Sequence, residues 1–99
     1  MKLIVLDVLK PSDPSIVDLS KKLTEEKSVE AVDITITEIE QRVEKVRIMI
    51  EGDDVNFDRI KKVLEKFGVT IHRVNRVTRG SRVFGMSQKE QVVPVEKEE

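Results

Sequence analysis

The chain has 99 residues, of which 37% are charged and 38% hydrophobic, and its 18 Lys and Arg nearly balance its 19 Asp and Glu for a net charge of -1. A chain of this length forms one domain with a modest core, and its charge balance does not favour a general polyanion binder. The absence of cysteine excludes disulfides, zinc–thiolate sites and thiol catalysis. No hydrophobic run approaches the roughly 20 residues of a membrane span, so we expect a cytoplasmic protein with no membrane partner. The heavy charge and the scarcity of Asn and Gln are typical of thermophilic proteins, which favour ion-pair networks.

Residues 2–10, KLIVLDVLK, form a short apolar run that ends at Pro11 and predict a central strand. Side chains alternate between the two faces of a strand. One face therefore carries Ile4, Leu6 and Val8, and the other carries Leu3, Val5, Asp7 and Leu9.

A first helix is expected after the sequence PSDPS. Asp13 is a natural N-cap, and Pro14 suits the first helical position, where its missing N–H is no loss. The helix is expected to reach about Lys27, with one apolar stripe facing the core. The stripe consists of Ile16, Leu19 and Leu23.

Residues 31–40 and 44–51 alternate between apolar and polar side chains, which predicts an antiparallel hairpin around the polar sequence EQRVE. We expect one face of each strand to point towards the core and the other face to be polar. The core-facing set is Val32, Ile34, Ile36, Val46, Ile48 and Ile50, and the opposite set is Asp33, Thr35, Thr37, Arg47, Met49 and Glu51.

A second helix follows Gly52, with Asp54 or Asn56 as its cap and Gly68 as its C-terminal stop. Residues 69–78 are rich in β-branched side chains and predict a last strand. The apolar positions of the helix are Phe57, Ile60, Val63, Leu64 and Phe67.

The resulting order, β-α-β-β-α-β, is that of the ferredoxin-like α+β sandwich, in which two helices cover one face of a four-stranded antiparallel sheet. We assign this domain to residues 1–80 and an irregular or disordered tail to residues 81–99. In this topology the first strand is central, and the face that carries Asp7 is left uncovered.

The uncovered face is predicted to expose several aliphatic side chains and Met49, more than a monomer usually leaves in water. A self-association surface is our first interpretation, and a ligand site is the alternative. Asp7 needs a partner, or burial will raise its pKa. Arg47 on the neighbouring strand is the candidate partner, with His72 on the other side. We interpret Asp7 first as part of an ion pair that fixes strand register, and otherwise as a contact for a ligand or a metal.

No catalytic group of residues is visible, and we do not expect an enzyme or a cofactor. His72 is the single histidine, so no Ser-His-Asp arrangement follows from it. The acidic segment Asp53, Asp54, Asn56 and Asp58 resembles the start of a calcium loop. Arg59 occupies the position where such a loop needs Gly, so a dipole interaction at a helix start is the commoner explanation and a weak surface cation site is the alternative.

Arginine recurs at every third position late in the chain, at Arg73, Arg76, Arg79 and Arg82. Alternation along a regular strand would send Arg73 and Arg79 to one face and Arg76 and Arg82 to the other. We therefore expect edge protection or salt bridges between subunits, with anion binding as an alternative. Nucleic acid is disfavoured as a partner, because the predicted central strands lack the aromatic side chains on which RNA-recognition modules stack bases.

The opening MKLIVLDVLKP with the nearby DPSI, and the later segment EGDDVNFDRIKKVLEKFGVTIHRVNRVTRG, resemble an archaeal family known as domain-of-unknown-function family two hundred and eleven. The likeness covers most of residues 1–80, and LDVLKP, IEG and IH carry most of it. The resemblance implies a ferredoxin-like sandwich that assembles into homo-oligomers, in rings, and it brings no established activity or catalytic residues.

Two functions from different classes follow. The first is a homo-oligomeric binding and assembly module that holds a small ligand or a cation at a subunit junction, using Asp7, Arg47 and His72 and then the acidic segment. The second is nucleic-acid association through the basic segment from Arg73 to Arg82, with affinity that falls steeply with salt.

Overall fold

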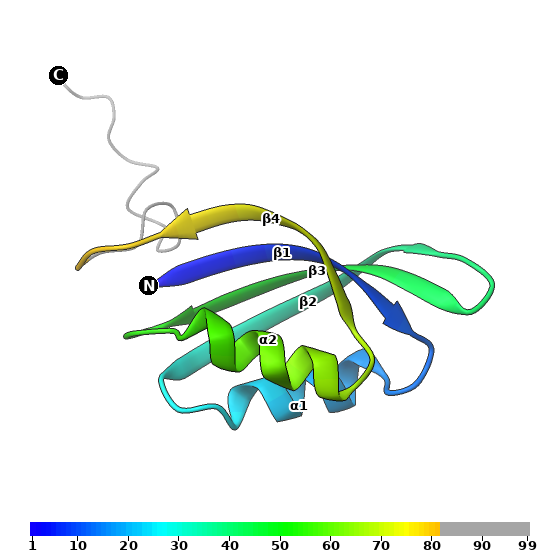
Figure 1. Cartoon of the computed structure of the whole chain (residues 1–99), viewed down its shortest axis with the longest axis horizontal. Coiled ribbons are helices and arrows are strands. Elements are labelled where there is room, and N and C mark those ends of the chain that lie inside the picture. Colours follow the sequence, from blue (N-terminus) through cyan, green and yellow to red (C-terminus); the bar gives the residue numbers. More distant parts are fainter. Residues whose placement is uncertain (82–99) are drawn as a thin grey trace, which may run out of the picture.

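The six predicted elements are present in the predicted order in the computed structural model, which describes residues 1–81 (Figure 1). They are β1 (Leu3–Pro11), α1 (Ile16–Thr24), β2 (Val29–Ile39), β3 (Val43–Gly52), α2 (Phe57–Lys66) and β4 (Thr70–Thr78). Arg82 and nearly all of the predicted tail lie outside the described residues. Neither of the two described helices has the length and apolar character needed to cross a membrane.

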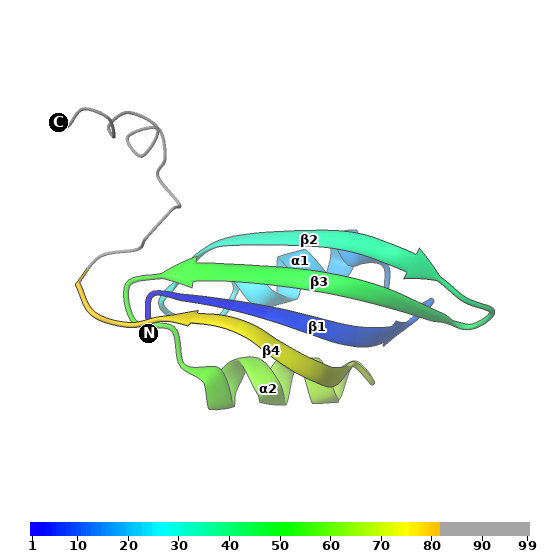
Figure 2. The ribbon, with the colours of Figure 1, turned by 90° about the horizontal axis from the view of Figure 1, so that it is seen from above.

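The four strands form one sheet in the order β2-β3-β1-β4, and every neighbouring pair is antiparallel. Figure 2 shows β3 and β1 in the middle of the sheet, with β2 and β4 at its edges. Both helices lie on the same face (Figure 1). The ferredoxin-like α+β prediction is therefore confirmed.

The core lies between the helices and one face of the sheet. Side chains alternate along β1 and β3, so the apolar side chains of the core lie on the face that the sequence predicted. The apolar stripes of α1 and α2 pack against them. Each of these side chains is at most 1% exposed, and burial of one such aliphatic side chain contributes about 1.5 to 3 kcal/mol. The set is Ile4, Leu6, Val8, Val46, Ile48, Ile50, Leu19, Leu23, Ile60 and Leu64.

The first helix begins later than the sequence predicted. Its N-cap is Ser15, whose hydroxyl oxygen accepts a hydrogen bond from the Asp18 N–H at 3.2 Å, so Asp13 is not the cap and Pro14 precedes the helix. The helix also ends at Thr24 instead of near Lys27.

Lys10 gives the physical reason for the late start of α1. Its side chain is 0% exposed on the core face of β1, and its ammonium donates to the carbonyl oxygens of Pro11 at 2.7 Å and Pro14 at 2.5 Å. It also pairs with Glu44 Oε1 on β3 at 2.8 Å. Carbonyls held by a buried cation are not free to join a helical turn, so this segment remains a loop.

The second helix follows the prediction closely. Its N-cap is Asn56, whose side-chain oxygen accepts from the Arg59 N–H at 3.2 Å. Gly68 follows with a φ of 75°, a conformation that glycine adopts without strain. Because Arg59 lies within this helix, the calcium-loop reading is excluded, as the sequence had indicated.

The face opposite the helices is less exposed than predicted. Leu3 is 0% and Val5 is 6% exposed, and Leu9 and Met49 are half-buried. Leu3 and Val5 belong to a central strand, so each has neighbours on both sides: Val5 lies opposite Met49 on β3 and Arg76 on β4. Long neighbouring side chains on the same face shield a strand residue from water.

Candidate functional site

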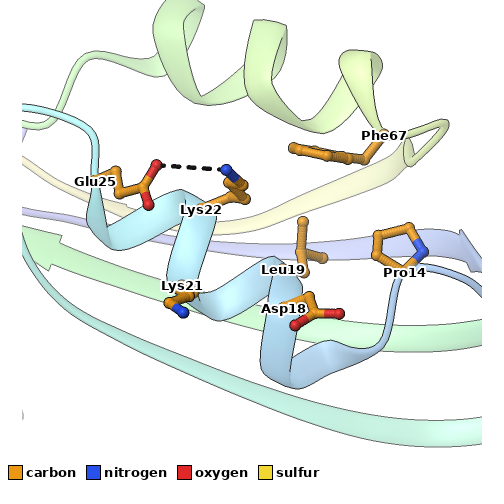
Figure 3. Close-up of a pocket in the computed structure, with 7 residues that line it drawn as sticks. All are labelled: Pro14, Asp18, Leu19, Lys21, Lys22, Glu25 and Phe67. Carbon is orange, nitrogen blue, oxygen red and sulfur yellow. Dashed lines mark ion pairs between the residues drawn. The ribbon is translucent and has the colours of Figure 1, made fainter.

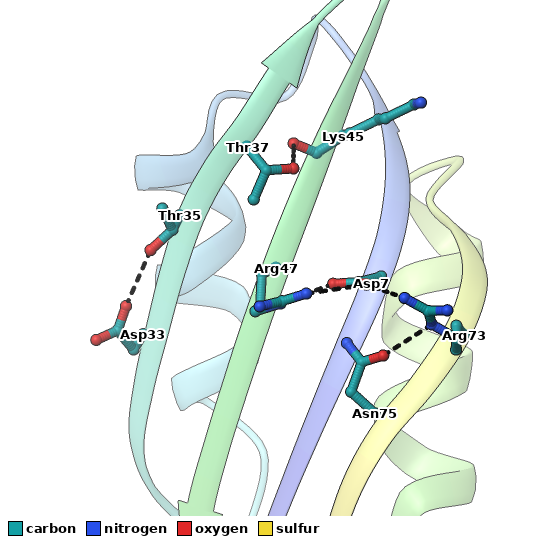
Figure 4. Close-up of polar contacts among 8 residues, drawn as sticks. All are labelled: Asp7, Asp33, Thr35, Thr37, Lys45, Arg47, Arg73 and Asn75. Atoms are coloured by element: carbon teal, nitrogen blue, oxygen red, sulfur yellow. Dashed lines mark hydrogen bonds and ion pairs between the residues drawn. The ribbon is translucent and has the colours of Figure 1, made fainter.

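A row of polar side chains crosses the uncovered face of the sheet, which we call the open face. Thr35, Arg47, Asp7 and Arg73 lie opposite one another on β2, β3, β1 and β4 in turn. Arg47 donates from Nε to Asp7 Oδ1 at 2.9 Å and from Nη2 to Asp7 Oδ2 at 3.2 Å (Figure 4). The predicted Asp7–Arg47 pair is therefore confirmed, in the two-point geometry that makes such pairs strong.

A second arginine reaches the same carboxylate from the other side. Arg73 Nη2 lies 3.5 Å from Asp7 Oδ2, and Arg73 Nε donates to Asn75 Oδ1 at 2.9 Å (Figure 4). The hydrogen bond from Arg47, a further hydrogen bond from Asn75 and the charges of both arginines lower the pKa of Asp7 from 3.8 to about 2. Asp7 is thus ionised at neutral pH. Both of its oxygens accept hydrogen bonds from Arg47, and Oδ2 also forms an ion pair with Arg73.

Two register shifts in β4 bring these groups together. Val5 and Leu6 face Arg76 and Val74, and Asp7 and Val8 face Arg73 and Ile71, so Asn75 and His72 are extra residues on β4. Each extra residue resets the alternation of side chains. As a result Arg73 and Arg76 both lie opposite open-face residues of β1, and the prediction that they occupy different faces is wrong.

A hollow of about 330 Å³ lies beside the polar row. It is lined by Asp7 and Leu9 of β1, Thr37 of β2, Lys45 and Val46 of β3, and His72 of β4. Thr37 donates from Oγ1 to the Lys45 carbonyl at 3.1 Å, and the Lys45 ammonium lies 3.5 Å from Glu38 Oε1. Every strand of the sheet therefore contributes to this hollow, which holds two of the three predicted ligand residues and adjoins the third, Arg47.

The sequence placed Thr37 on this face, but it did not point to Asn75 or Lys45 or to the contact of Arg73 with Asp7. The places of Asn75 and Arg73 depend on the register shifts in β4, which no sequence pattern marked. His72 was suggested as a partner of Asp7, but Arg73 is the residue opposite Asp7. His72 instead lines the hollow, and within residues 1–81 its ring makes no hydrogen bond or ion pair.

A second hollow, of about 370 Å³, lies on the helix side between α1 and the end of α2 (Figure 3). Phe67, Leu19 and Pro14 form its apolar wall. Two of its polar groups, Lys22 and Glu25, pair with each other at 3.8 Å. None of the predicted site residues lines it, so the open-face hollow is the better candidate.

The acidic segment does not gather into a metal site. Asp54 Oδ1 pairs with the N-terminal ammonium of Met1 at 3.2 Å, and Asp53 Oδ1 pairs with Lys2 Nζ at 2.9 Å, which lowers the pKa of Asp53. Asn56 is engaged as the cap of α2, and Asp58 lies in the first turn of that helix. Among the residues that the structure describes, no cluster of three or more His, Asp or Glu side chains could hold a metal ion.

Comparison with known proteins gives a family and no activity. A family model described as uncharacterized ArCR, DUF211, matches residues 2–92, and so extends beyond the residues 1–80 to which the sequence resemblance was assigned. The uncharacterized protein MJ0319 of Methanocaldococcus jannaschii is 41% identical over 81 residues, which are 82% of this chain and 84% of that protein. The chain therefore belongs to DUF211, an archaeal family of unknown function.

Proposed function

We propose that the protein is a binding module that assembles into homo-oligomers and holds a small anionic ligand in the open-face hollow. The observation that carries this proposal is the meeting of Asp7, His72 and Lys45, from three different strands, around one hollow beside the Asp7–Arg47 pair. Its volume of about 330 Å³ falls at the lower end of the range of small-molecule sites.

The hydrogen-bonding groups around the hollow favour an anion over a cation. Among the described residues that line it, Asp7 is the one carboxylate, and both of its oxygens are already used by Arg47 and Arg73. A guanidinium has five N–H donors, so each arginine keeps donors that Asp7 does not use, and the His72 ring offers another. A ligand with acceptor oxygens, such as a small carboxylate or a phosphate, matches these donors. Leu9, which is half-buried on the same face, supplies a contact for a short apolar part of the ligand.

Assembly is supported by the sheet itself. Within residues 1–81, β2 and β4 each have a neighbouring strand on one side only, and Val74 and Val77 of β4 are 44% and 46% exposed. A chain of this length has a modest core of its own, so burial against a second copy would add stability. Size-exclusion chromatography with light scattering on the full chain tests this part: we expect a multiple of the 11.4 kDa chain mass, and a clean monomer at micromolar concentration would contradict it.

The ligand part is tested by calorimetric titration of inorganic phosphate, succinate and calcium chloride into the full chain. Leu9→Trp would fill the hollow without a change of charge, and Val17→Trp, at a position on α1 that is 72% exposed, is its matched control. We expect phosphate or succinate to bind both the wild type and the Val17→Trp variant. Neither anion should bind the Leu9→Trp variant. Binding of calcium alone, or anion binding that survives in Leu9→Trp, would overturn the anion assignment, and no binding by any of the three would count against a ligand site.

Nucleic-acid association is the second candidate, and one observation favours it. The register shifts place Arg73 and Arg76 on the same face of the sheet, beside Arg47. A basic surface of this kind binds phosphates with an affinity that falls as salt rises. Absence of binding to a single-stranded oligonucleotide at low salt, measured by fluorescence anisotropy, would dispose of this function.

A further inference from the structure

The two edge strands of the sheet carry charges of opposite sign. β2 contains Glu30, Asp33 and Glu38 and no basic residue. β4 contains His72, Arg73 and Arg76 and no acidic residue. Two copies of one edge would therefore repel each other, whereas β4 of one copy would attract β2 of another.

The direction of the strands permits this contact. Each neighbouring pair in the order β2-β3-β1-β4 is antiparallel, so β2 and β1 run in one direction, and β3 and β4 run in the other (Figure 2). A second copy in the same orientation would therefore bring its β2 antiparallel to β4. The alternation of strands would continue, and the helices of both copies would lie on the same side of the extended sheet.

Residues that lie opposite one another across the four strands form rows, and each row can be continued from β4 into β2 of the next copy. In this register the side chains that meet are complementary on both faces of the sheet. On the open face, Asp33 and Arg76 terminate one row, which runs through Met49 and Val5. The next copy would place its Asp33 beside Arg76, and the two opposite charges would attract each other.

On the helix face, one row begins at Val32 on β2 and ends at Val77 on β4. A second row on this face begins at Ile34 and ends at Val74. Val74 and Val77 are 44% and 46% exposed, and they would lie beside Ile34 and Val32 of the next copy. The same register thus pairs opposite charges on one face and apolar side chains on the other.

We infer that the chain assembles head to tail, with the basic edge strand β4 of one copy on the acidic edge strand β2 of the next. This inference rests on the assembly part of the proposed function and specifies its surface. Such an interface is heterologous, so repeated contacts close into a ring or continue as a filament.

Cysteine pairing tests the geometry, because the chain contains no cysteine of its own. Val32→Cys and Val77→Cys are prepared separately, mixed and oxidised. We expect a disulfide-linked dimer in the mixture and none in either variant alone. A dimer of Val77→Cys alone would indicate β4 against β4, and a dimer of Val32→Cys alone would indicate β2 against β2; either result would overturn the inference.

Charge reversal tests the complementarity. Asp33→Lys and Arg76→Glu should each weaken association by about tenfold, and the chain that carries both reversals should recover it, because the two edges again differ in sign. Glu65→Lys and Lys61→Glu on α2 are controls matched in charge, and we expect both to associate as the wild type does. Failure of the double reversal to recover association would contradict the inference.

These outcomes separate this inference from the proposed function. A wild-type chain that light scattering shows to be a monomer would remove this inference together with the assembly part of the proposed function. An assembled wild type that gives no mixed disulfide would remove the head-to-tail contact and leave assembly intact.

Discussion

The two faces of the sheet differ in the interactions that stabilise them. The helix-covered face is an apolar core that also holds the ion pair between the buried Lys10 and Glu44. The open face carries the Asp7 network and a hollow that every strand helps to line. The covered face follows from the alternation of apolar residues, whereas the open face follows from the register between strands. Comparison of variants on the two faces tests this division of roles.

The largest effect is expected on the covered face, at Lys10. Lys10→Met removes the ammonium and leaves Glu44 and the loop carbonyls without their partner, and loss of one member of a buried pair costs about 3 to 5 kcal/mol of unfolding free energy. Urea unfolding measures it, with Lys62→Met on the exposed side of α2 as the control. A loss no greater than that of the control would show that the pair is not needed for the fold.

An aliphatic truncation compares the two faces directly. Leu6→Ala should lower the free energy of unfolding by about 3 kcal/mol, because Leu6 is 0% exposed in the core. Met49→Ala on the open face should cost about 1 kcal/mol, because Met49 is half-buried and makes fewer contacts to lose. Similar losses in the two variants would refute the assignment of the core to one face.

The fold could be predicted from the sequence because its signals are local. The short apolar run in β1, the period-two alternation in β2 and β3, the helical spacing in α2 and the Gly68 stop each needed only a short window. Lys10 could not be identified as buried, because its partners are carbonyls of a loop and a carboxylate on another strand. The open face was predicted in part: the Asp7–Arg47 pair follows from regular pairing, whereas the place of Arg73 and Arg76 depends on Asn75 and His72, which no sequence pattern marked.

On the open face, Asp7→Asn removes the charge that Arg47 and Arg73 share. Hydrogen bonds to charged groups contribute about 1.5 to 3 kcal/mol, so we expect a loss of about 2 kcal/mol at neutral pH, measured by thermal or urea unfolding. A stability equal to that of the wild type would mean that the network does not contribute to holding the sheet.

The same carboxylate predicts a dependence on pH. The pKa of Asp7 is lowered from 3.8 to about 2, so the unfolded chain takes up the proton first as pH falls. The contribution of Asp7 is therefore complete above about pH 4 and is lost as pH falls towards about 2. Asp7→Asn should show a shallower loss of stability over this window, and parallel curves for the two proteins would contradict the assignment.

The smallest effect is expected at Asn75. Asn75→Ala removes one hydrogen bond to Asp7 and one from Arg73, and we expect a loss of about 1 kcal/mol. It should raise the pKa of Asp7 less than Arg47→Ala does, because Arg47 is the larger cause of the lowered value. Carboxyl NMR titration distinguishes the two variants, and a larger rise in Asn75→Ala would reverse this order.

Hydrogen exchange followed by mass spectrometry tests most directly whether the sheet edges are the assembly surface and the helix layer is the scaffold. The full chain is compared in its dilute and its concentrated state. We expect the amides of β2 and β4 to exchange more slowly in the concentrated state and those of α1 and α2 to exchange at the same rate in both states. Slower exchange in the helices with unchanged edge strands would contradict it.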